Sequence, residues 1–514
     1  MKRRTFIQIS GTTAGLLLLP RSTLGAYSHS LGPPENTLSD MVDAAVSAGA
    51  RYCDARYHLH RSQIIQLRKE NTHSLSDTSE GGFSMRVYYD GGWSSVCFSE
   101  RDPPNLRALA KHALAMASVN AATARMDFDE SNRVKNMRAS WETPVEIDPF
   151  SIPLEEKIEF LREIATAPLV NPQIPYSVAN LFQHRHDVRF VNSYDAHLQQ
   201  TFMNVYKNFA VTAFDTANRL MDSRSSDREA RGGGWEIVQQ YSSSEMRTAI
   251  QEVMAKQKAD SLSSGRFDIV VDSTVLWDLI SDTLLPHLDP RRMLERDGVR
   301  PGGRWLTPDS VGSKRLASEA LTLGWDNTMA GGLATCGWDD AGRPASSGTL
   351  IDRGVLINAV ASDEIEFATP HVQFTRTSSW RLPAQCAMPN VIVESREGKN
   401  LQQLIASVEN GLLIRGKGSI VTNPQRTLFR ARPQLGWRIR NGERQEMLRD
   451  FEIELPVDQF WNSLVEVSSA REIQVAGELF PDRVFALWNQ PFSVAAPHAL
   501  FHNVPVYSSK ETMR

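Results

Sequence analysis

The chain has 514 residues, of which 41% are hydrophobic, so it can bury large cores in two or three domains. A formal net charge of −4 provides no basic footprint and excludes nucleic acid as an expected partner. Four cysteines (Cys53, Cys97, Cys336 and Cys386) occur without CxxC spacing, so neither a zinc ribbon nor a redox pair is indicated.

The first 26 residues have the pattern of an export signal. Arg3 and Arg4 form a twin arginine, the apolar run Ala14–Pro20 follows, and Gly25 and Ala26 supply small residues for a cleavage site. The run is far shorter than the roughly 20 apolar residues of a membrane-spanning helix, so no stable span is expected after cleavage. The pattern resembles a Tat signal and predicts a periplasmic protein; a Sec signal with a chance arginine pair and an uncleaved anchor are the alternatives.

Residues 36–235 are predicted to form an α/β region in two sub-parts, about 36–120 and 150–235, with a polar linker between them. The first sub-part is expected to contain helices at Ser39–Ala50 and Asn105–Val119 and strands at Cys53–His60, Ser62–Arg68, Phe83–Tyr89 and Trp93–Phe98. The second is expected to contain a helix at Leu154–Ala167 and strands at Tyr176–His186, Val188–Ser193 and Gln199–Asp215.

Histidines on these strands raise the question of a metal site. His184 and His186 share one strand face and His197 follows, but without a carboxylate or a fourth partner at supporting spacing an exposed polar face is the favoured interpretation. In an oxidising compartment the cysteines could pair, and Cys53 with Cys97 is the first candidate because both lie on strands of one region.

The stretch Phe267–Arg291 organises the second half of the chain. A β-branched apolar run, Ile269–Val271, predicts a buried strand, and Asp272–Thr274 supplies a turn and a helix cap. Apolar residues then recur at helical spacing from Val275 until Pro286 ends or kinks the helix.

This stretch resembles the core of the TldD/PmbA metallopeptidase family. There the helix carries HExxxH, whose two histidines bind zinc while the glutamate acts as general base. Aligned without gaps, the motif positions fall on Ser281, Asp282 and Pro286, and His287 lies one residue late. The resemblance therefore implies the scaffold of the peptidase with a degenerate zinc motif.

Further phrases extend the resemblance from residue 39 to residue 506. GGFSMRVYYDGGWSSVCF is similar to the family's amino-terminal domain and places Arg86 at the family's arginine, although a solvated strand residue is favoured over a catalytic one. Gly337–Pro344 is similar to a "DDEG" loop, and Ala387–Asn390 to "RMTN". The family's third zinc ligand is a late cysteine, and the counterpart here, Glu478–Phe485, contains none.

Residues 236–510 are predicted to be a large strand-rich carboxy-terminal domain. Short strands are expected at Ser419–Thr422, Thr427–Ala431, Gly436–Arg440, Asp450–Leu455 and Val484–Trp488. Such a run suggests a curved sheet or a barrel-like sandwich. The predicted fold class is therefore α+β, an α/β amino-terminal domain followed by this strand-rich domain.

Two interpretations of function follow from the resemblance. In the first, the chain is a PmbA-type subunit without its own zinc that binds unfolded peptides in a homodimer or in a heterodimer with a zinc-bearing TldD-type relative; a pure peptide-binding module is a variant of it. In the second, it is an active metal-dependent peptidase whose site is rebuilt from Asp282, His287 and Asp289. The first implies no cofactor in this chain, with zinc in a partner subunit; whether the chain is an enzyme stays open.

Overall fold

A computed structural model describes residues 35–123, 127–131, 133–227, 230–240, 243–295, 305–362, 369–416, 418–479 and 490–509. The predicted signal (residues 1–26), the predicted strand Val484–Trp488 and nearly all of the Glu478–Phe485 loop lie outside these residues. In the described part, no helix is both long and apolar enough to cross a membrane.

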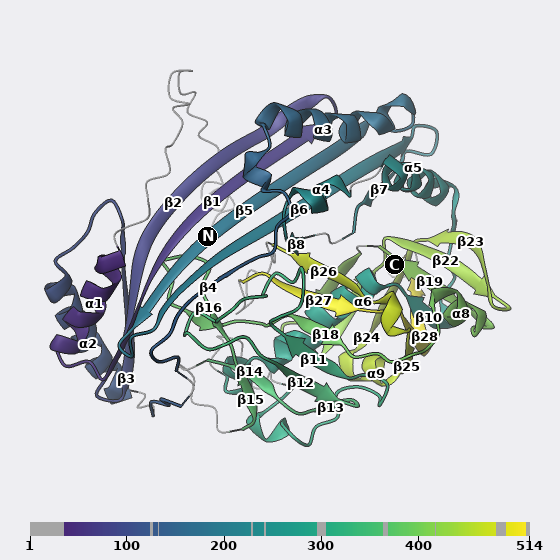
Figure 1. Ribbon diagram of the computed structural model, residues 1–514. Coiled ribbons are helices and arrows are strands. Elements are labelled where there is room, and N and C mark those ends of the chain that lie inside the picture. The colour runs from purple at the N-terminus through teal and green to yellow at the C-terminus, as the bar shows by residue number, and fades with distance from the viewer. Residues whose placement is uncertain are drawn as a thin grey trace, which may run out of the picture.

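One long, strongly curved sheet carries the first half of the chain (Figure 1). Its strand order is β3-β2-β1-β5-β6-β4, and β7 and β8 also pair with β6. The strands are β1 (Tyr52–Arg68), β2 (Asn71–Tyr89), β3 (Gly92–Ser99), β4 (Arg138–Glu142), β5 (Tyr176–Asn192), β6 (His197–Asp215), β7 (Leu220–Ser225) and β8 (Arg231–Gly232). The two predicted sub-parts therefore share a single sheet through the antiparallel pairing of β1 with β5.

Three of these strands are longer than the sequence indicated: β2 begins at Asn71 and not at Phe83, and β1 and β5 each join two predicted strands. Breaks were expected near residues 61 and 187, but β1 and β5 run through them. At the second position Asp187 accepts hydrogen bonds from Arg185 and from Thr201 on the neighbouring strand β6. The hydrogen-bonding capacity of the Asp187 carboxylate is thus met by neighbours on the sheet, and the strand can continue through this polar residue without a turn.

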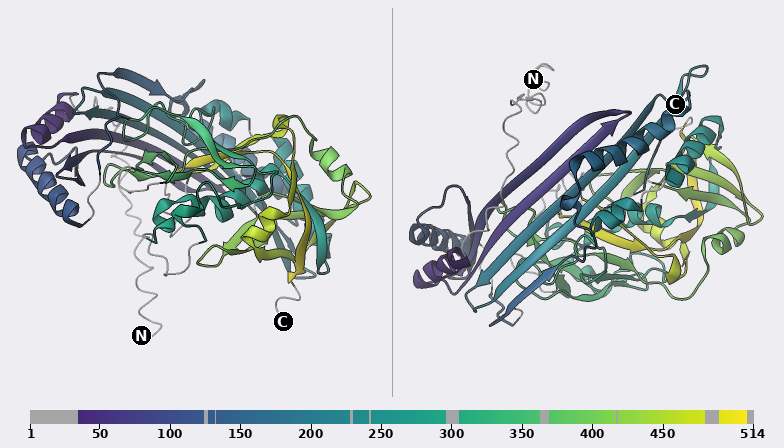
Figure 2. Two further views of the ribbon diagram at one scale, coloured as in Figure 1. Left: turned by 90° about the horizontal axis from the view of Figure 1, so that it is seen from below. Right: turned by 45° about the horizontal axis from the view of Figure 1, so that its top comes forward.

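Helices cover one face of this sheet and the second half of the chain covers the other (Figure 1, Figure 2). The helices are α1 (Glu35–Ser47), α2 (Leu106–Thr123), α3 (Leu154–Thr166), α4 (Trp235–Gln239) and α5 (Ser243–Lys258). Odd-numbered residues of β1 face them: Cys53 and Tyr57 share a core with α1 and α2, and Ile65 packs with α3. Because side chains alternate along a strand, even-numbered residues of β1 face the second half.

The second half contains a ten-stranded sheet and a six-stranded sheet. The ten are β9 (Asp260–Ser261), β10 (Gly265–Val271), β19 (Asn410–Arg415), β20 (Ser419–Thr422), β21 (Leu428–Arg432), β22 (Leu435–Arg440), β23 (Glu443–Arg449), β24 (Phe451–Pro456), β25 (Leu464–Val467) and β28 (Ala499–Ser508). The six are β11 (Leu323–Asp326), β12 (Ser347–Asp352), β13 (Val355–Leu356), β18 (Val391–Val393), β26 (Gln474–Glu478) and β27 (Phe492–Ala496).

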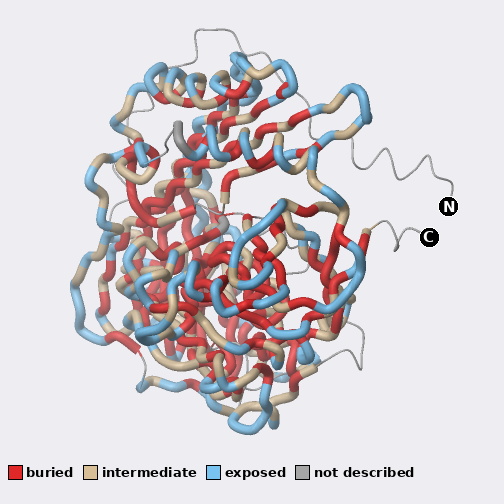
Figure 3. The backbone as a smooth tube through the Cα atoms, turned by 90° about the vertical axis from the view of Figure 1, so that its right-hand side faces the viewer, coloured by how far each residue is buried: buried red, intermediate tan, exposed pale blue. Residues whose placement is uncertain are grey.

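Short elements complete this half. They are the strand pairs β14 (Ala359–Ala361) with β15 (His371–Gln373) and β16 (Thr375–Arg376) with β17 (Gln385–Cys386), and the helices α6 (Ser273–Leu279), α7 (Pro290–Met293), α8 (Leu401–Ala406) and α9 (Val457–Asn462). Figure 3 shows buried residues concentrated inside this half and along the long strands that face it. The predicted mixed fold with a strongly curled, strand-rich architecture is confirmed.

The strand, cap and helix predicted from Phe267 onward are present as β10 and α6. Asp272 caps the helix by accepting a hydrogen bond of 2.9 Å from the Val275 N–H. The helix is shorter than expected and continues as a π-helical turn, Ile280–Leu284, and a 3₁₀ turn, Leu285–Leu288. Pro286 has no N–H for the α-helical bond to residue 282, and the Asp282 carbonyl instead accepts from the guanidinium of Arg426 at 3.2 Å.

The expected pairing of Cys53 with Cys97 is wrong. Cys53 lies on β1 and Cys97 on β3, and β2 runs between them. Neighbouring strands are about 4.8 Å apart, so residues two strands apart exceed the roughly 7 Å between Cα atoms that a disulfide spans. Cys53 is buried, Cys97 is exposed, and both are free thiols, as are Cys336 and Cys386.

Candidate functional site

The concave face of the long sheet meets the second half of the chain through polar contacts of the Gly337–Pro344 loop. Arg56 on β1 donates a hydrogen bond of 2.8 Å to the Asp340 carbonyl. Gln200 on β6 donates to the Trp338 carbonyl at 3.0 Å and accepts from the N–H groups of Gly337 and Trp338. The loop that carries part of the family resemblance therefore fixes the two halves against each other.

A buried ionic triad lies beside this contact. Asp54 pairs with Arg56 at 3.0 Å and with Arg86 at 2.9 Å, and the side chains of all three are at most 2% exposed. Burial by itself would raise the pKa of Asp54, but Arg86 and Arg56 outweigh burial and hold that pKa below its ordinary value. The Arg86 guanidinium also lies 4.6 Å from the centre of the Trp93 ring.

The expectation that Arg86 is a solvated strand residue is therefore wrong. The strand pattern fixes only which side of β2 the residue occupies, and that side is covered by the second half of the chain. Asp54 stands directly opposite Arg86 in the β1–β2 register, so the guanidinium finds its counter-charge inside the fold.

Four histidines continue the same face along β1 and β5. His58 and His60 alternate on β1, His184 and His186 alternate on β5, and His60 stands opposite His186 in the antiparallel register. One hydrogen bond of 2.9 Å joins Nδ1 of His58 to Nε2 of His186, and another of 3.1 Å joins Nδ1 of His60 to Nε2 of His184. The rings of His60 and His186 stack with their centres 3.9 Å apart.

This histidine cluster is largely withdrawn from solvent. His58 is 0%, His186 5% and His60 8% exposed, and His184 is of intermediate exposure. Burial, with further contributions from Arg56 and His60, lowers the pKa of His58 well below its usual value. Burial lowers the pKa of His60 to about 3 and that of His184 to about 4, so the rings are neutral at physiological pH.

The sequence interpretation of the histidines was wrong in two respects. An exposed polar face was favoured for His184 and His186, but the second half of the chain buries it, and the partners missed were His58 and His60 on β1. His197 does not join them; its ring contacts the Asp195 carboxylate at 3.0 Å. The sequence does contain a pattern that could have predicted the cluster. His-x-His occurs in both CDARYHLH and FQHRH, and on a strand this spacing places the two histidines on one face.

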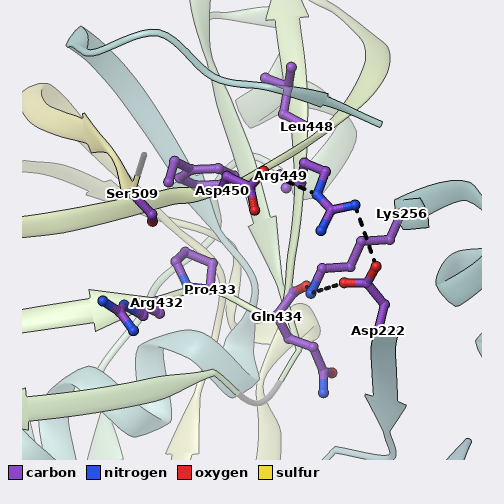
Figure 4. Close-up of a pocket in the computed structure, with 11 residues that line it drawn as sticks. Asp222, Lys256, Arg432, Pro433, Gln434, Leu448, Arg449, Asp450 and Ser509 are labelled. Atoms are coloured by element: carbon purple, nitrogen blue, oxygen red, sulfur yellow. Dashed lines mark hydrogen bonds and ion pairs between the residues drawn. The ribbon is translucent and has the colours of Figure 1, made fainter. Parts of the chain in front are cut away.

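A pocket on the described surface lies at another joint between the two halves (Figure 4). It has a volume of about 250 Å³ and is lined by residues of β7, α5, β22 and β23. Asp222 pairs with Lys256 at 3.9 Å and with Arg449 at 3.5 Å, and Lys256 donates to the Gln434 carbonyl at 2.8 Å. Asp222, Lys256 and Arg449 are therefore paired with one another across the joint between the two halves. These contacts indicate a structural role for the charged residues in the pocket wall.

Comparison with known proteins decides the family. The model of "PmbA/TldA metallopeptidase domain 1" matches residues 53–117, that of the central domain matches 147–260 and that of the C-terminal domain matches 264–508. The chain belongs to the TldD/PmbA metallopeptidase family. It is 23% identical over 402 residues to a metalloprotease of Methanothermobacter thermautotrophicus, covering 78% of this chain and 84% of that protein.

A second relative and two solved structures also match most of the chain. A metalloprotease of Archaeoglobus fulgidus is 22% identical over 407 residues, covering 78% of this chain and 88% of that protein. The crystal structure of a putative modulator of DNA gyrase from Bacteroides thetaiotaomicron superposes with a TM-score of 0.69 at 17% identity, covering 92% of this chain and 98% of that one. TldE from Thermococcus kodakarensis superposes with a TM-score of 0.65 at 17% identity, covering 91% and 99%.

The residues at the positions of the TldD/PmbA zinc motif do not fit a zinc ion. Structural and catalytic zinc sites take Cys, His or carboxylate ligands. Ser281 offers a neutral hydroxyl on a fully buried side chain, Pro286 has no donor atom, and Asp282 alone cannot hold the ion.

Two members of the alternative set of Asp282, His287 and Asp289 make local structural contacts. The His287 ring is buried, donates from Nε2 to the Arg426 carbonyl at 3.1 Å and packs edge-on against Trp305. Asp289 caps α7 by accepting from the Arg291 N–H at 2.8 Å and pairs with the Arg291 guanidinium at 2.9 Å. Among the described residues, the group whose ligand atoms converge is instead His58, His60 and His186.

Proposed function

We propose that this chain is a PmbA-type member of the family that lacks the family zinc site, binds unfolded peptides and works in a complex with a zinc-bearing relative. The proposal rests on the residues that occupy the zinc-ligand positions of the family motif. These are Ser281, Asp282 and Pro286, and they lie on the helical segment that follows the strand and cap of the family fold. A family fold that keeps its strand, cap and helix but offers no ligand set supports a binding role. We further propose a two-fold pair, with itself or with that relative, that buries more than about 2,000 Å².

An open strand edge supports peptide binding. β2 pairs with β3 only from Gly82 onward, and in the described part of the chain no strand pairs with its outer edge over residues 71–80. That stretch is almost entirely exposed. An unpaired edge of this length accepts an extended peptide by strand addition, in which main-chain hydrogen bonds provide affinity with little demand on sequence.

The purified chain alone is expected to show no zinc-dependent cleavage of an unfolded peptide. Zinc catalysis needs three protein ligands and an open position beside the general base, and the motif positions Ser281, Asp282 and Pro286 do not supply them. Co-expression with a zinc-bearing relative is expected to produce a stable complex that cleaves the peptide. Cleavage is followed by mass spectrometry with and without a chelator. Zinc-dependent cleavage by the isolated chain that Asp282→Ala abolishes would overturn the proposal.

Proline substitutions at Thr78 and Ser79 test the open edge. Successive N–H groups of a strand point to opposite edges, so one of these residues donates to β1 and the other points outward. At the outward position proline is expected to weaken binding of a fluorescent unfolded peptide at least about tenfold and to change stability by less than about 1 kcal/mol. The inward position is the matched control and should destabilise the fold. Unchanged peptide binding in a folded outward variant would exclude this edge.

The proposed activity is expected in the periplasm, which the protein would reach by Tat export. Because Arg3 and Arg4 precede an apolar run and small residues, we propose a mature periplasmic protein that begins near residue 26. Replacing both arginines with lysine is expected to leave the full-length precursor in the cytoplasm, as measured by fractionation and immunoblotting. Periplasmic amounts equal to those of the wild type would contradict the assignment.

A further inference from the structure

The histidine cluster of β1 and β5 contains nitrogens placed close enough for one ion. One ligand atom each of His58, His60 and His186 lies within 4.8 Å of the other two. In a tetrahedral zinc site with Zn–N bonds of about 2.0–2.1 Å, ligand nitrogens are about 3.3 Å apart. The 2.9 Å separation of His58 Nδ1 and His186 Nε2 is already near that value, so modest side-chain rotations would bring the set to bonding distance.

The cluster also leaves hydrogen-bonding capacity unused. Nε2 of His58 and Nε2 of His60 are buried and have no hydrogen-bond partner. Each ring already uses Nδ1 toward a second histidine. Whichever tautomer a neutral ring adopts, its Nε2 is then either a buried lone pair or a buried N–H without a partner, and both carry a desolvation penalty. An ion that binds Nε2 of either ring would remove the penalty there by accepting its lone pair, whereas an ion that binds Nδ1 of His58 would replace that atom's hydrogen bond to His186.

The positive charges that act on the cluster are partly offset. Arg56 and Arg376 both disfavour a positive charge on these rings, but each is paired, Arg56 with Asp54 at 3.0 Å and Arg376 with Asp340 at 3.6 Å. The rings themselves are held neutral by burial, which is the state in which imidazole binds metals. The fourth histidine, His184, hydrogen-bonds to Nδ1 of His60 and is partly exposed, so it can orient His60 and border a path from solvent.

We propose that His58, His60 and His186 bind one divalent first-row transition-metal ion, with His184 as a positioning residue for His60. Imidazole-only ligation suits Zn²⁺, Cu²⁺ and Ni²⁺ and disfavours Mg²⁺ and Ca²⁺, which prefer oxygen ligands. The ion would clamp β1 to β5 at the face that receives the second half of the chain. The site is separate from the Ser281–Pro286 helix, and binding here is independent of whether the chain cleaves peptides.

Calorimetric titration of chelator-stripped, full-length chain with Zn²⁺ tests the site. The wild type is expected to bind one ion per chain, and excess Mg²⁺ should not compete. His58→Gln/His186→Gln is expected to lose this binding, and His184→Gln to weaken it about 10–100-fold. The matched control is His197→Gln, on the neighbouring strand β6 but outside the cluster, which should bind as the wild type does. Absent binding in the wild type, or equal binding in the double variant, overturns the proposal.

Spectroscopy of the wild-type chain tests the metal site without relying on the double variant, which could fail to fold. Co²⁺ in the same site is expected to show the intense visible absorption of a tetrahedral or five-coordinate ion without a thiolate charge-transfer band. X-ray absorption of the zinc-loaded chain is expected to show at least three imidazole ligands. Fewer imidazoles, or any sulfur ligand, overturn the proposal, while peptide cleavage measured in parallel reports separately on the proposed function.

Discussion

Replacing Asp54 with alanine is expected to lower the free energy of unfolding by about 3–5 kcal/mol. Asp54 is the shared counter-charge of Arg56 and Arg86, and all three side chains are buried. Its removal leaves two guanidinium groups in the interior without a carboxylate, and such charges cost far more than the lost hydrogen bonds. Because Arg56 also holds the Asp340 carbonyl, the contact between the two halves should loosen as well.

Denaturant unfolding at pH 7 measures this effect against an exposed pair. Asp195 and Arg138 lie 3.1 Å apart, but their side chains are 63% and 67% exposed. Arg138→Ala should therefore change stability by less than about 1 kcal/mol. Adding Arg86→Met to Asp54→Ala should recover part of the loss, because one uncompensated charge is removed with the carboxylate. A loss below about 1 kcal/mol in Asp54→Ala would show that solvent reaches the triad.

Lowering the pH from 7 to 5 is expected to destabilise the metal-free chain by at least about 5 kcal/mol, because the lowered pKa values of His58 and His186 act in the same direction as the three histidines counted here. Burial lowers the pKa of His60 and of His287 to about 3 and that of His184 to about 4. An unfolded histidine titrates near 6.5, so between pH 6.5 and these folded values the unfolded state binds more protons and stability falls as the pH falls. At pH 5 each of the three contributes a loss of about 2 kcal/mol. The pKa of Asp272, raised to about 6 by burial, offsets about 1 kcal/mol of this.

Guanidinium unfolding at both pH values, in the presence of a chelator, measures the difference. His287→Gln removes one buried titrating ring outside the histidine cluster, so its loss between pH 7 and 5 should be smaller than that of the wild type by about 2 kcal/mol. Equal stability of the wild type at pH 7 and pH 5 would mean that the cluster takes up protons without unfolding.

Local sequence patterns determined the elements whose causes lie within a few residues. The run Ile269–Val271 and the cap Asp272 predicted β10 and the start of α6, because strand propensity and capping act locally. The end of the helix was predicted less well: α6 ends at Leu279, before Pro286, and irregular helical turns continue to Leu288. The strand Ser419–Thr422 was predicted with its observed bounds. The short phrases that resemble the family were also readable from the sequence, and with them the mixed fold.

Only the tertiary structure decided which side chains are buried together. Arg86 and Asp54 are 32 residues apart in sequence, and His58 and His186 are 128 apart. Their meeting depends on the register of β1 with β2 and with β5, which no local pattern specifies, and on the second half of the chain that covers their face of the sheet. The alternation of a strand shows that two histidines share a face. Whether that face meets water or a second domain depends on long-range packing, and this packing determines the charge state and the contacts of every residue on the candidate site.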